Sequence, residues 1–84
     1  MNKDLPPYSE LAQSLKLGVY QHYKGGIYQV LGVGRHTEDE TQELVIYQSV
    51  TTGDMWVRPI ELFFEIVEVE NYHGPRFVYL KSNE

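Results

Sequence analysis

Residues 18–33 read GVYQHYKGGIYQVLGV, and this stretch decides the fold. Apolar and aromatic residues alternate with polar ones on both sides of Gly25-Gly26, which predicts two antiparallel strands joined by a tight turn. The second strand carries apolar residues on both of its faces, as expected of a strand that curls round a small barrel. Gly32 and Gly34 are positions where that strand can bend or bulge.

Downstream of this hairpin the chain continues as short strands. Runs of β-branched and aromatic residues predict strands over 44–50 and 55–58, separated by a turn with Gly53 at its tip. The polar and acidic residues 35–42 predict a loop. Five or six short strands with brief connections favour a mainly β domain, and specifically a small SH3-like barrel.

The next segment mixes a helical spacing of apolar residues with a strand-like alternation. We expect one helical or 3-10 turn over 59–64, with Phe63 and Phe64 in the core. A strand over 65–70, a loop over 71–75 and a closing strand are expected to follow.

The N-terminal part of the chain differs from the rest. A Pro-Pro pair stiffens residues 1–7, and Ser9 then provides the N-cap of a short helix. Leu11 and Leu15, at i and i+4, form the apolar side of that helix, and Gly18 ends it. Two segments result: an arm with a short helix, residues 1–17, and a single barrel domain, residues 18–84.

Composition indicates how so small a chain is held together. Its 84 residues leave room for one core, and the absence of cysteine excludes disulfides. His22, His36 and His73 lack the spacing of a metal-binding helix, so we expect no metal and no cofactor. Seven Tyr, three Phe and one Trp remain, and each can bury about 150–250 Å². Aromatic packing is therefore expected to stabilise the fold.

The formal net charge of −5 opposes non-specific binding to the phosphates of DNA. Carboxylates concentrate between residues 38 and 43. Several cations lie near aromatic residues: Lys24, Arg35, Arg58 and Arg76. The N-terminus contains no apolar run long enough for a signal peptide or a membrane span. We expect a cytoplasmic protein that neither enters membranes nor binds DNA non-specifically.

An ordered set of motifs runs through the barrel segment: GVYQHYKGGIYQV at 18–30, RHTE at 35–38, VIY at 45–47, WVRPIELFFE at 56–65 and RF at 76–77. This set resembles the DUF1653 family of small bacterial domains of unknown function. The resemblance covers residues 18–77 and implies an SH3-like barrel, in agreement with the strand pattern. It implies no reaction.

The motif RHTE places a guanidinium, an imidazole, a hydroxyl and a carboxylate at the start of the predicted loop. Arg35 can bind a carboxylate or a phosphate, and His36 and Glu38 can form hydrogen bonds or transfer a proton. A structural role is also open, in which Thr37 caps the turn and Arg35 pairs with Glu38 or Glu43 to close the barrel.

A second candidate site is WVRP at 56–59, where strand alternation places Trp56 and Arg58 on one face and Val57 in the core. An exposed Trp beside an Arg is common in binding hot spots. Trp56 can instead be the largest residue of the core. Several tyrosines can line a concave surface nearby: Tyr20, Tyr23, Tyr28 and Tyr47.

Together these residues favour a binding module over an enzyme. The expected ligand site is a polar-aromatic groove made by Arg35, His36, Glu38, Tyr47, Trp56 and Arg58. Its ligand is expected to be anionic and planar, such as a nucleotide or single-stranded nucleic acid, or else a short peptide. A protein-interaction or scaffolding domain is the alternative, and a small acid–base hydrolase using His36 and Glu38 ranks last. We expect a monomer or a weak homo-oligomer.

Overall fold

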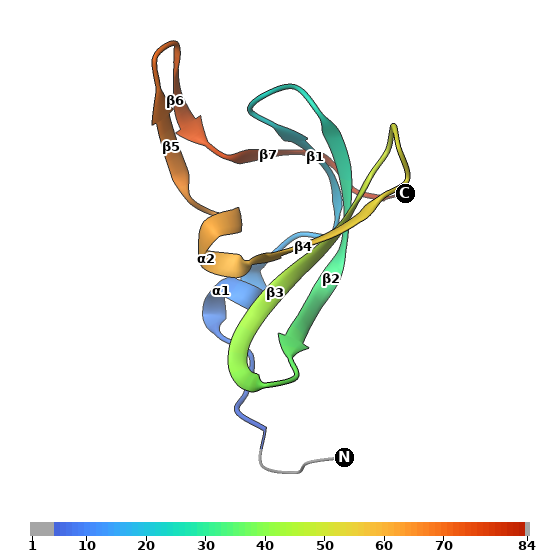
Figure 1. Ribbon diagram of the computed structural model, residues 1–84, viewed down its shortest axis with the longest axis vertical. Coiled ribbons are helices and arrows are strands. Elements are labelled where there is room, and N and C mark those ends of the chain that lie inside the picture. Colours follow the sequence, from blue (N-terminus) through green and yellow to red (C-terminus); the bar gives the residue numbers. More distant parts are fainter. Residues whose placement is uncertain (1–4, 84) are drawn as a thin grey trace.

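The computed structural model describes residues 5–83, which form seven strands and two short helices (Figure 1). In chain order the elements are α1 (Glu10–Ser14), β1 (Gly18–His22), β2 (Ile27–His36), β3 (Asp39–Ser49), β4 (Met55–Pro59), α2 (Ile60–Phe63), β5 (Ile66–Val69), β6 (Tyr72–Pro75) and β7 (Phe77–Lys81). The prediction of a mainly β domain with a short N-terminal helix and a helical turn near 59–64 is confirmed.

Five of the strands form one curved, antiparallel sheet in the order β4-β3-β2-β1-β7, and β5 and β6 form a separate hairpin (Figure 1). Within residues 5–83 no ladder joins the edge strands β4 and β7, so the sheet is open. Pro59 ends β4 and α2 carries the chain out of the sheet, after which β7 returns to pair with β1. The structure thus differs from the expected barrel in having seven strands, rather than five or six, and no closure.

The β1–β2 hairpin follows the sequence pattern closely. Gly25 lies in its turn with a φ of 111°, a value that side chains with a Cβ rarely adopt. The register of β2 against β3 shifts between Val30 and Gly32, which is the bulge that the glycine predicts. Beyond this bulge, Val33 lies opposite Val45 and packs against the core.

The acidic segment 35–42 is not the loop that its composition predicts. β2 and β3 continue through it as paired strands, and only residues 37 and 38 form the turn. Local hydrogen bonds support this tip, where the Glu38 N–H donates to Nδ1 of His36 at 3.0 Å. The polar side chains mark a solvent-exposed hairpin, which composition alone does not distinguish from a loop.

Residues 71–75 were also expected to be a loop, but they contain β6. This strand pairs with β5, and the ring of its first residue, Tyr72, stacks on Tyr23 with 5.4 Å between centroids. The stacking partner lies in the β1–β2 turn, 49 positions away in the chain. A tertiary contact therefore supports a strand that the local sequence does not predict.

Helix α1 begins after its Ser9 N-cap, as predicted, but it is only five residues long. Ala12 is its buried residue, whereas Leu11 is 37% exposed. Gly18 does not end the helix but begins β1 with a φ of 151°, where an added Cβ would lie 2.3 Å from the carbonyl oxygen of Lys81. No helix in residues 5–83 combines the length and apolar character needed to cross a membrane.

The core lies between the inner face of the sheet and the two helices, and most of its volume is aromatic. Its buried members are Ala12, Tyr20, Val30, Val45, Tyr47, Ile60, Phe63 and Phe77. Phe63 stacks on Phe77 with 4.3 Å between centroids. Phe64, which was expected in the core, is 36% exposed, because α2 ends at Phe63 and directs Ile60 and Phe63 inward. The core is thus built of packed aromatic rings, as predicted.

Candidate ligand-binding face

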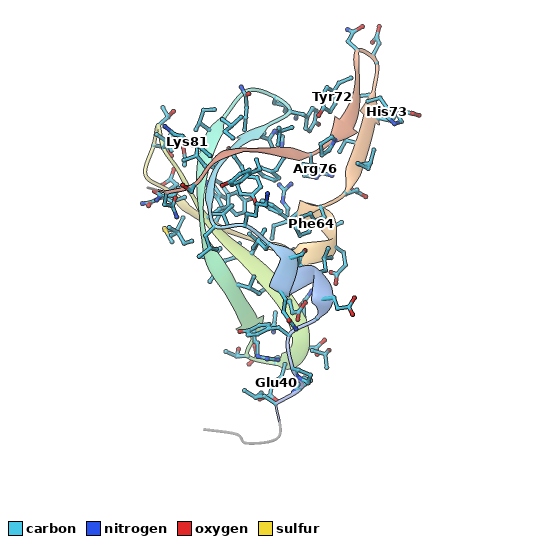
Figure 2. All side chains as sticks on the ribbon, turned by 180° about the vertical axis from the view of Figure 1, so that it is seen from behind. Glu40, Phe64, Tyr72, His73, Arg76 and Lys81 are labelled. Atoms are coloured by element: carbon cyan, nitrogen blue, oxygen red, sulfur yellow. The ribbon has the colours of Figure 1, made fainter. Side chains whose placement is uncertain are left out.

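The six residues expected to form one groove lie in two parts of the molecule. Arg35, His36 and Glu38 belong to the tip of the β2–β3 hairpin. Tyr47, Trp56 and Arg58 lie further from this tip, on β3 and β4. Figure 2 shows the hairpin tip, marked by Glu40, at the opposite end of the molecule from Tyr72 and the β5–β6 hairpin.

At the hairpin tip, Arg35 binds the N-terminal arm, residues 5–9. Its Nη2 donates to the carbonyl oxygen of Pro6 at 2.7 Å, and its Nη1 donates to that of Glu40 at 3.1 Å. The guanidinium also lies 4.2 Å from the centroid of the Tyr8 ring. Arg35 thus has partners within its own chain on three sides.

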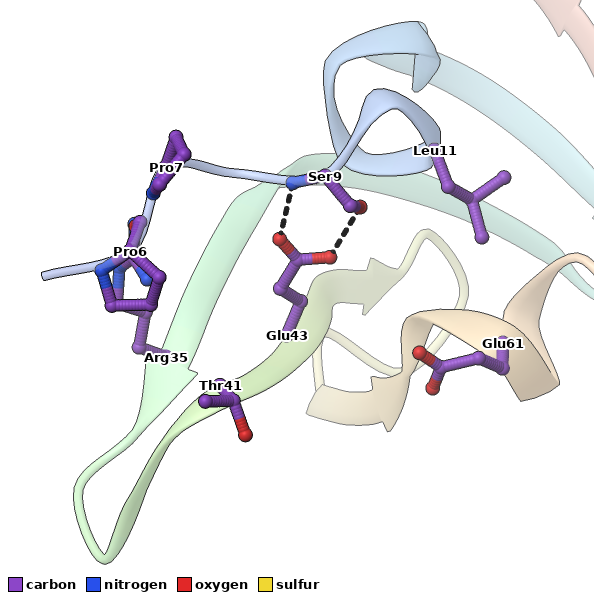
Figure 3. A pocket seen from close by; sticks show the side chains of 8 residues that line it. All are labelled: Pro6, Pro7, Ser9, Leu11, Arg35, Thr41, Glu43 and Glu61. Atoms are coloured by element: carbon purple, nitrogen blue, oxygen red, sulfur yellow. Dashed lines mark hydrogen bonds between the residues drawn. The ribbon is translucent and has the colours of Figure 1, made fainter.

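Glu43 is the residue directly opposite Arg35 across the β2–β3 ladder, and it binds the next part of the arm. Its carboxylate accepts from the Ser9 hydroxyl at 2.6 Å and from the Ser9 N–H at 2.7 Å (Figure 3). These hydrogen bonds, the hydroxyl first, lower the pKa of Glu43 below its ordinary value. We name Arg35 and Glu43 the arm clamp. The sequence offered Glu43 only as an ion-pair partner of Arg35, and within residues 5–83 the ion pairs do not include this one. Its role in holding the arm was not predicted.

His36 and Glu38 lie on the open turn beside the clamp. The two side chains are 42% and 81% exposed, and Oε1 of Glu38 is 3.9 Å from Nδ1 of His36. That nitrogen already accepts the Glu38 N–H, and Glu38 accepts the Thr37 hydroxyl at 2.9 Å. The geometry stabilises a turn and provides no enclosure for proton transfer at this position. Within residues 5–83 no group of His, Cys, Asp and Glu side chains is arranged to hold a metal.

The second group lies on the inner face of the sheet. Trp56 is the partner of Tyr47 across the β3–β4 ladder, and Arg58 is the partner of Val45, so both share the face of the core. Tyr47 is buried, but Trp56 is 52% exposed because β4 is an edge strand. The expectation that Val57 faces the core is wrong, since the register turns it to the outer face, where it is 61% exposed.

A row of rings extends from this point across the inner face. Tyr28 meets Tyr47 edge-on at 5.3 Å and His22 at 6.4 Å between centroids. The ring centroid of His22 lies 4.6 Å from that of Tyr23, and Tyr23 in turn stacks on Tyr72 of β6. His22, Tyr23, Tyr28 and Tyr72 are half-buried, so part of each ring reaches solvent. We name this surface the aromatic–arginine face: His22, Tyr23, Tyr28, Trp56, Arg58, Tyr72 and Arg76.

Arg58 provides unneutralised positive charge on this face. Its guanidinium lies 5.5 Å from the centroid of Phe77, and the residue is half-buried. Among residues 5–83, no carboxylate forms an ion pair with it. Arg76, by contrast, pairs with Glu65 and donates its Nε to the carbonyl oxygen of Leu62 at 3.2 Å.

His22 shows the effect of these charges. Burial lowers its pKa below the ordinary value, and the nearby cations Arg58, Arg76 and Lys24 lower it further. Three cations thus act on one imidazole in a protein whose net charge is −5. Arg58, which forms no ion pair with a carboxylate of residues 5–83, thus places a positive charge beside the aromatic surface of this face.

The DUF1653 family, described as a protein of unknown function, matches residues 18–79. The chain belongs to the DUF1653 family. It is similar to the crystal structure of a DUF1653 protein from Bordetella bronchiseptica, with 30% sequence identity and a TM-score of 0.77, over 87% of this chain and 96% of that one. No curated protein matches the chain.

The whole aromatic–arginine face of this DUF1653 domain lies inside the matched segment, and so does the arm clamp. The arm itself precedes the segment. Sequence reasoning identified Trp56 and Arg58 but did not place His22, Tyr72 or Arg76 in the site. The signal available for His22 and Arg76 was their position within the motifs HYKGG and RF. Tyr72 lay in a predicted loop and had no comparable signal.

Proposed function

We propose that this DUF1653 domain is a binding module whose aromatic–arginine face takes a planar anionic ligand, a nucleotide or a short stretch of single-stranded nucleic acid. The observation that carries this proposal is the half-buried guanidinium of Arg58, which has no carboxylate partner within residues 5–83. A cation partly withdrawn from water gains from an anionic partner, and a guanidinium matches a phosphate through paired hydrogen bonds.

The neighbouring rings supply surface for a planar group. Trp56, two residues before Arg58 on the same face of β4, is 52% exposed. Stacking of a base on an aromatic side chain contributes about 1–3 kcal/mol. Tyr72, from the separate β5–β6 hairpin, adds a second ring at the far end of the row. The combination of exposed rings with Arg58, which has no carboxylate partner within residues 5–83, favours single-stranded or mononucleotide ligands, whose bases are accessible.

Charge limits the class of nucleic acid. With Arg58 as the phosphate contact, since Arg76 already pairs with Glu65, we expect a slope of log K against log salt of about −0.7 for a single strand, at roughly −0.7 per phosphate. Duplex DNA presents no exposed bases to the rings, and the net charge of −5 repels it. The proposal therefore expects weak salt dependence and no binding to duplex DNA.

An NMR titration of the ¹⁵N-labelled protein tests this function. Adenosine and uridine monophosphate and a single-stranded hexanucleotide are added separately, and the indole signal of Trp56 and the amide signals of Arg58 and Tyr72 are followed. We expect saturable shifts confined to these residues and their neighbours. Replacement of Trp56 by Ala should lower affinity about tenfold, the equivalent of 1.4 kcal/mol.

Val57→Ala is the matched control, because Val57 is also exposed on β4 but lies on the outer face. It should leave nucleotide affinity unchanged. If Trp56→Ala and Val57→Ala bind the same ligands equally well, or if none of the ligands shifts the Trp56 indole, the proposed function is wrong.

Protein interaction is the second candidate, and the outer face of the sheet favours it. Met55, Val57 and Val78 project from this face and are 55%, 61% and 42% exposed. Exposed apolar side chains that share a face are common at interaction sites. Analytical ultracentrifugation over a wide concentration range separates the two functions. Self-association that Val57→Ser abolishes, in a protein indifferent to nucleotides, would support interaction.

A further inference from the structure

The arm clamp contacts both main-chain and side-chain groups of the arm. Arg35 donates to the carbonyl oxygen of Pro6 at 2.7 Å, and Glu43 accepts the N–H of Ser9 at 2.7 Å. Recognition of main-chain carbonyl and N–H groups is typical of sites that bind extended peptides. Two side chains add selectivity: the ring of Tyr8 on the guanidinium, and the hydroxyl of Ser9 on the carboxylate.

The sheet positions the two side chains of the clamp. Arg35 and Glu43 face each other across the β2–β3 ladder, so the sheet sets their separation. The second amino group of Arg35 is anchored to the carbonyl oxygen of Glu40 at 3.1 Å. Glu43 is only 7% exposed, although it carries a charge. A buried carboxylate of this kind requires hydrogen-bond donors, and here the arm supplies them.

The arm, in turn, lies on the surface like a bound peptide. Pro7, Tyr8 and Ser9 are all exposed, and the Pro-Pro pair limits the entropy lost when the segment is held extended. A pocket of about 300 Å³ opens next to it (Figure 3). Its lining residues are Pro6, Pro7, Ser9, Leu11, Arg35, Thr41, Glu43 and Glu61. A longer or bulkier segment therefore has room beside the present one.

The clamp and the arm differ in their relation to the family. Arg35 and Glu43 lie within the matched residues 18–79, whereas residues 5–9 precede them. We propose that the arm clamp is a peptide-binding site, occupied here in cis by the arm. It takes a segment of a partner protein with the chemistry of this arm: extended, containing Pro-Pro, and followed by an aromatic residue and Ser.

The tethered arm controls access to this site. A segment linked to its site by a short chain acts at an effective concentration of the order of millimolar. A free peptide that makes the same contacts therefore competes only near that concentration. Weakening the arm should lower the concentration needed, because it removes the competitor and leaves the clamp intact.

The test uses the full chain carrying Tyr8→Ala and Ser9→Gly. These changes remove the ring from Arg35 and the hydroxyl from Glu43, while Gly remains an acceptable N-cap for α1. A peptide with the sequence of residues 5–11, LPPYSEL, is added to the ¹⁵N-labelled protein. We expect shifts in the amides of Arg35, Thr41 and Glu43, at a peptide concentration at least tenfold lower than in the wild-type chain.

Two controls define the site. A peptide with Ala in place of its Tyr and Ser should bind at least tenfold more weakly. Addition of Glu43→Gln to the double variant should have the same effect on the unmodified peptide. Equal binding of LPPYSEL to the wild-type chain and the double variant, or no binding to a double variant that retains its hairpin signals, would overturn the proposal.

A second measurement needs no substitution. LPPYSEL carrying a nitroxide label is added to the wild-type chain at millimolar concentration. Exchange with the arm should broaden the amide signals of Arg35 and Glu43 and shift those of Tyr8 and Ser9. Unchanged signals at all four positions would also overturn the proposal. Neither experiment involves the aromatic–arginine face, so the proposed function can fail or succeed independently.

Discussion

Ser9 gives Glu43 two hydrogen bonds from one residue, at 2.6 Å from its hydroxyl and 2.7 Å from its N–H. The same hydroxyl accepts the Ala12 N–H at 3.0 Å and thereby caps α1. One carboxylate thus connects the arm, the first helix and the β2–β3 hairpin. Since Ala12 belongs to the core, this connection also positions the helix against the sheet.

Glu43→Gln should lower the free energy of unfolding at neutral pH by about 1.5–3 kcal/mol, as expected when a hydrogen-bonded charge is lost. Urea denaturation followed by Trp fluorescence measures this change. Glu38→Gln is the control, because the Glu38 side chain is 81% exposed and should contribute almost nothing. Equal stability of the two variants would show that the contact with Ser9 contributes little.

Glu43 should also make the stability depend on pH. Its pKa in the folded protein is below the ordinary value of 4.5, so the unfolded chain binds more protons as the pH falls through this range. The contribution is present above pH 4.5 and is lost as the pH falls through the lower, folded-state pKa. Hydrogen bonds from Thr41 lower the pKa of Asp39 as well, so Asp39 also makes stability fall at low pH. This effect is the same in the wild-type chain and in Glu43→Gln. The wild-type chain should therefore lose more stability than Glu43→Gln, and parallel curves would contradict the assignment.

Arg58→Gln should raise the pKa of His22 toward its ordinary value of 6.5, because Arg58 is the leading charge among the causes that lower it. The imidazole C–H signals of His22, followed by NMR through a pH titration, report this directly. Burial remains, so the recovery should be partial. Lys81→Gln, which removes an exposed cation from β7, should leave the titration unchanged. An unaltered pKa in Arg58→Gln would place Arg58 away from the imidazole in solution.

Gly18→Ala should destabilise the fold strongly, by about 1–3 kcal/mol from the backbone conformation alone. The φ of 151° and the Lys81 carbonyl oxygen, 2.3 Å from the added Cβ, both oppose it. Gly32→Ala is the matched control on the same sheet, since nothing lies within 4 Å of its added Cβ. Thermal unfolding of the two variants tests this, and a similar loss in both would refute the steric explanation.

Phe63→Ala should cost about 3–5 kcal/mol, as is usual for removal of a buried ring. Phe63 is 1% exposed and contacts Tyr20, Tyr47 and Phe77. A loss of this size approaches the whole stability of a small domain, about 5 kcal/mol or somewhat more. Phe64→Ala should cost much less, because Phe64 is 36% exposed. Circular dichroism at ambient temperature should show Phe63→Ala largely unfolded and Phe64→Ala folded.

Features governed by neighbouring residues could be predicted from the sequence. The turn at Gly25-Gly26 depends on the positive φ of Gly25, which glycine allows. The bulge lies where Gly32 predicted it, between Val30 and Gly32. The Ser9 cap follows from a side-chain oxygen placed next to unpaired helical N–H groups. The aromatic core could be inferred from composition, since so small a chain without cysteine has few other means of stabilisation.

Features that depend on residues far away in the chain could not be predicted from the sequence. Residues 35–42 and 71–75 resemble loops in composition, but strand pairing and the contact between Tyr23 and Tyr72 make them strands. The face that Val57 occupies depends on the register of β4 against β3, and a shift of one residue would reverse it.

In the candidate site, too, the sequence predicted some features and the tertiary structure decided others. Alternation along β4 was enough to place Trp56 and Arg58 on one face, because a strand repeats every two residues. Only the tertiary structure separated them from Arg35, and only the docking of the β5–β6 hairpin brought Tyr72 to the row of rings. The hairpin GVYQHYKGGIYQVLGV was thus determined by its own residues. The partners of its rings were decided by packing between segments far apart in the chain, which no local pattern encodes.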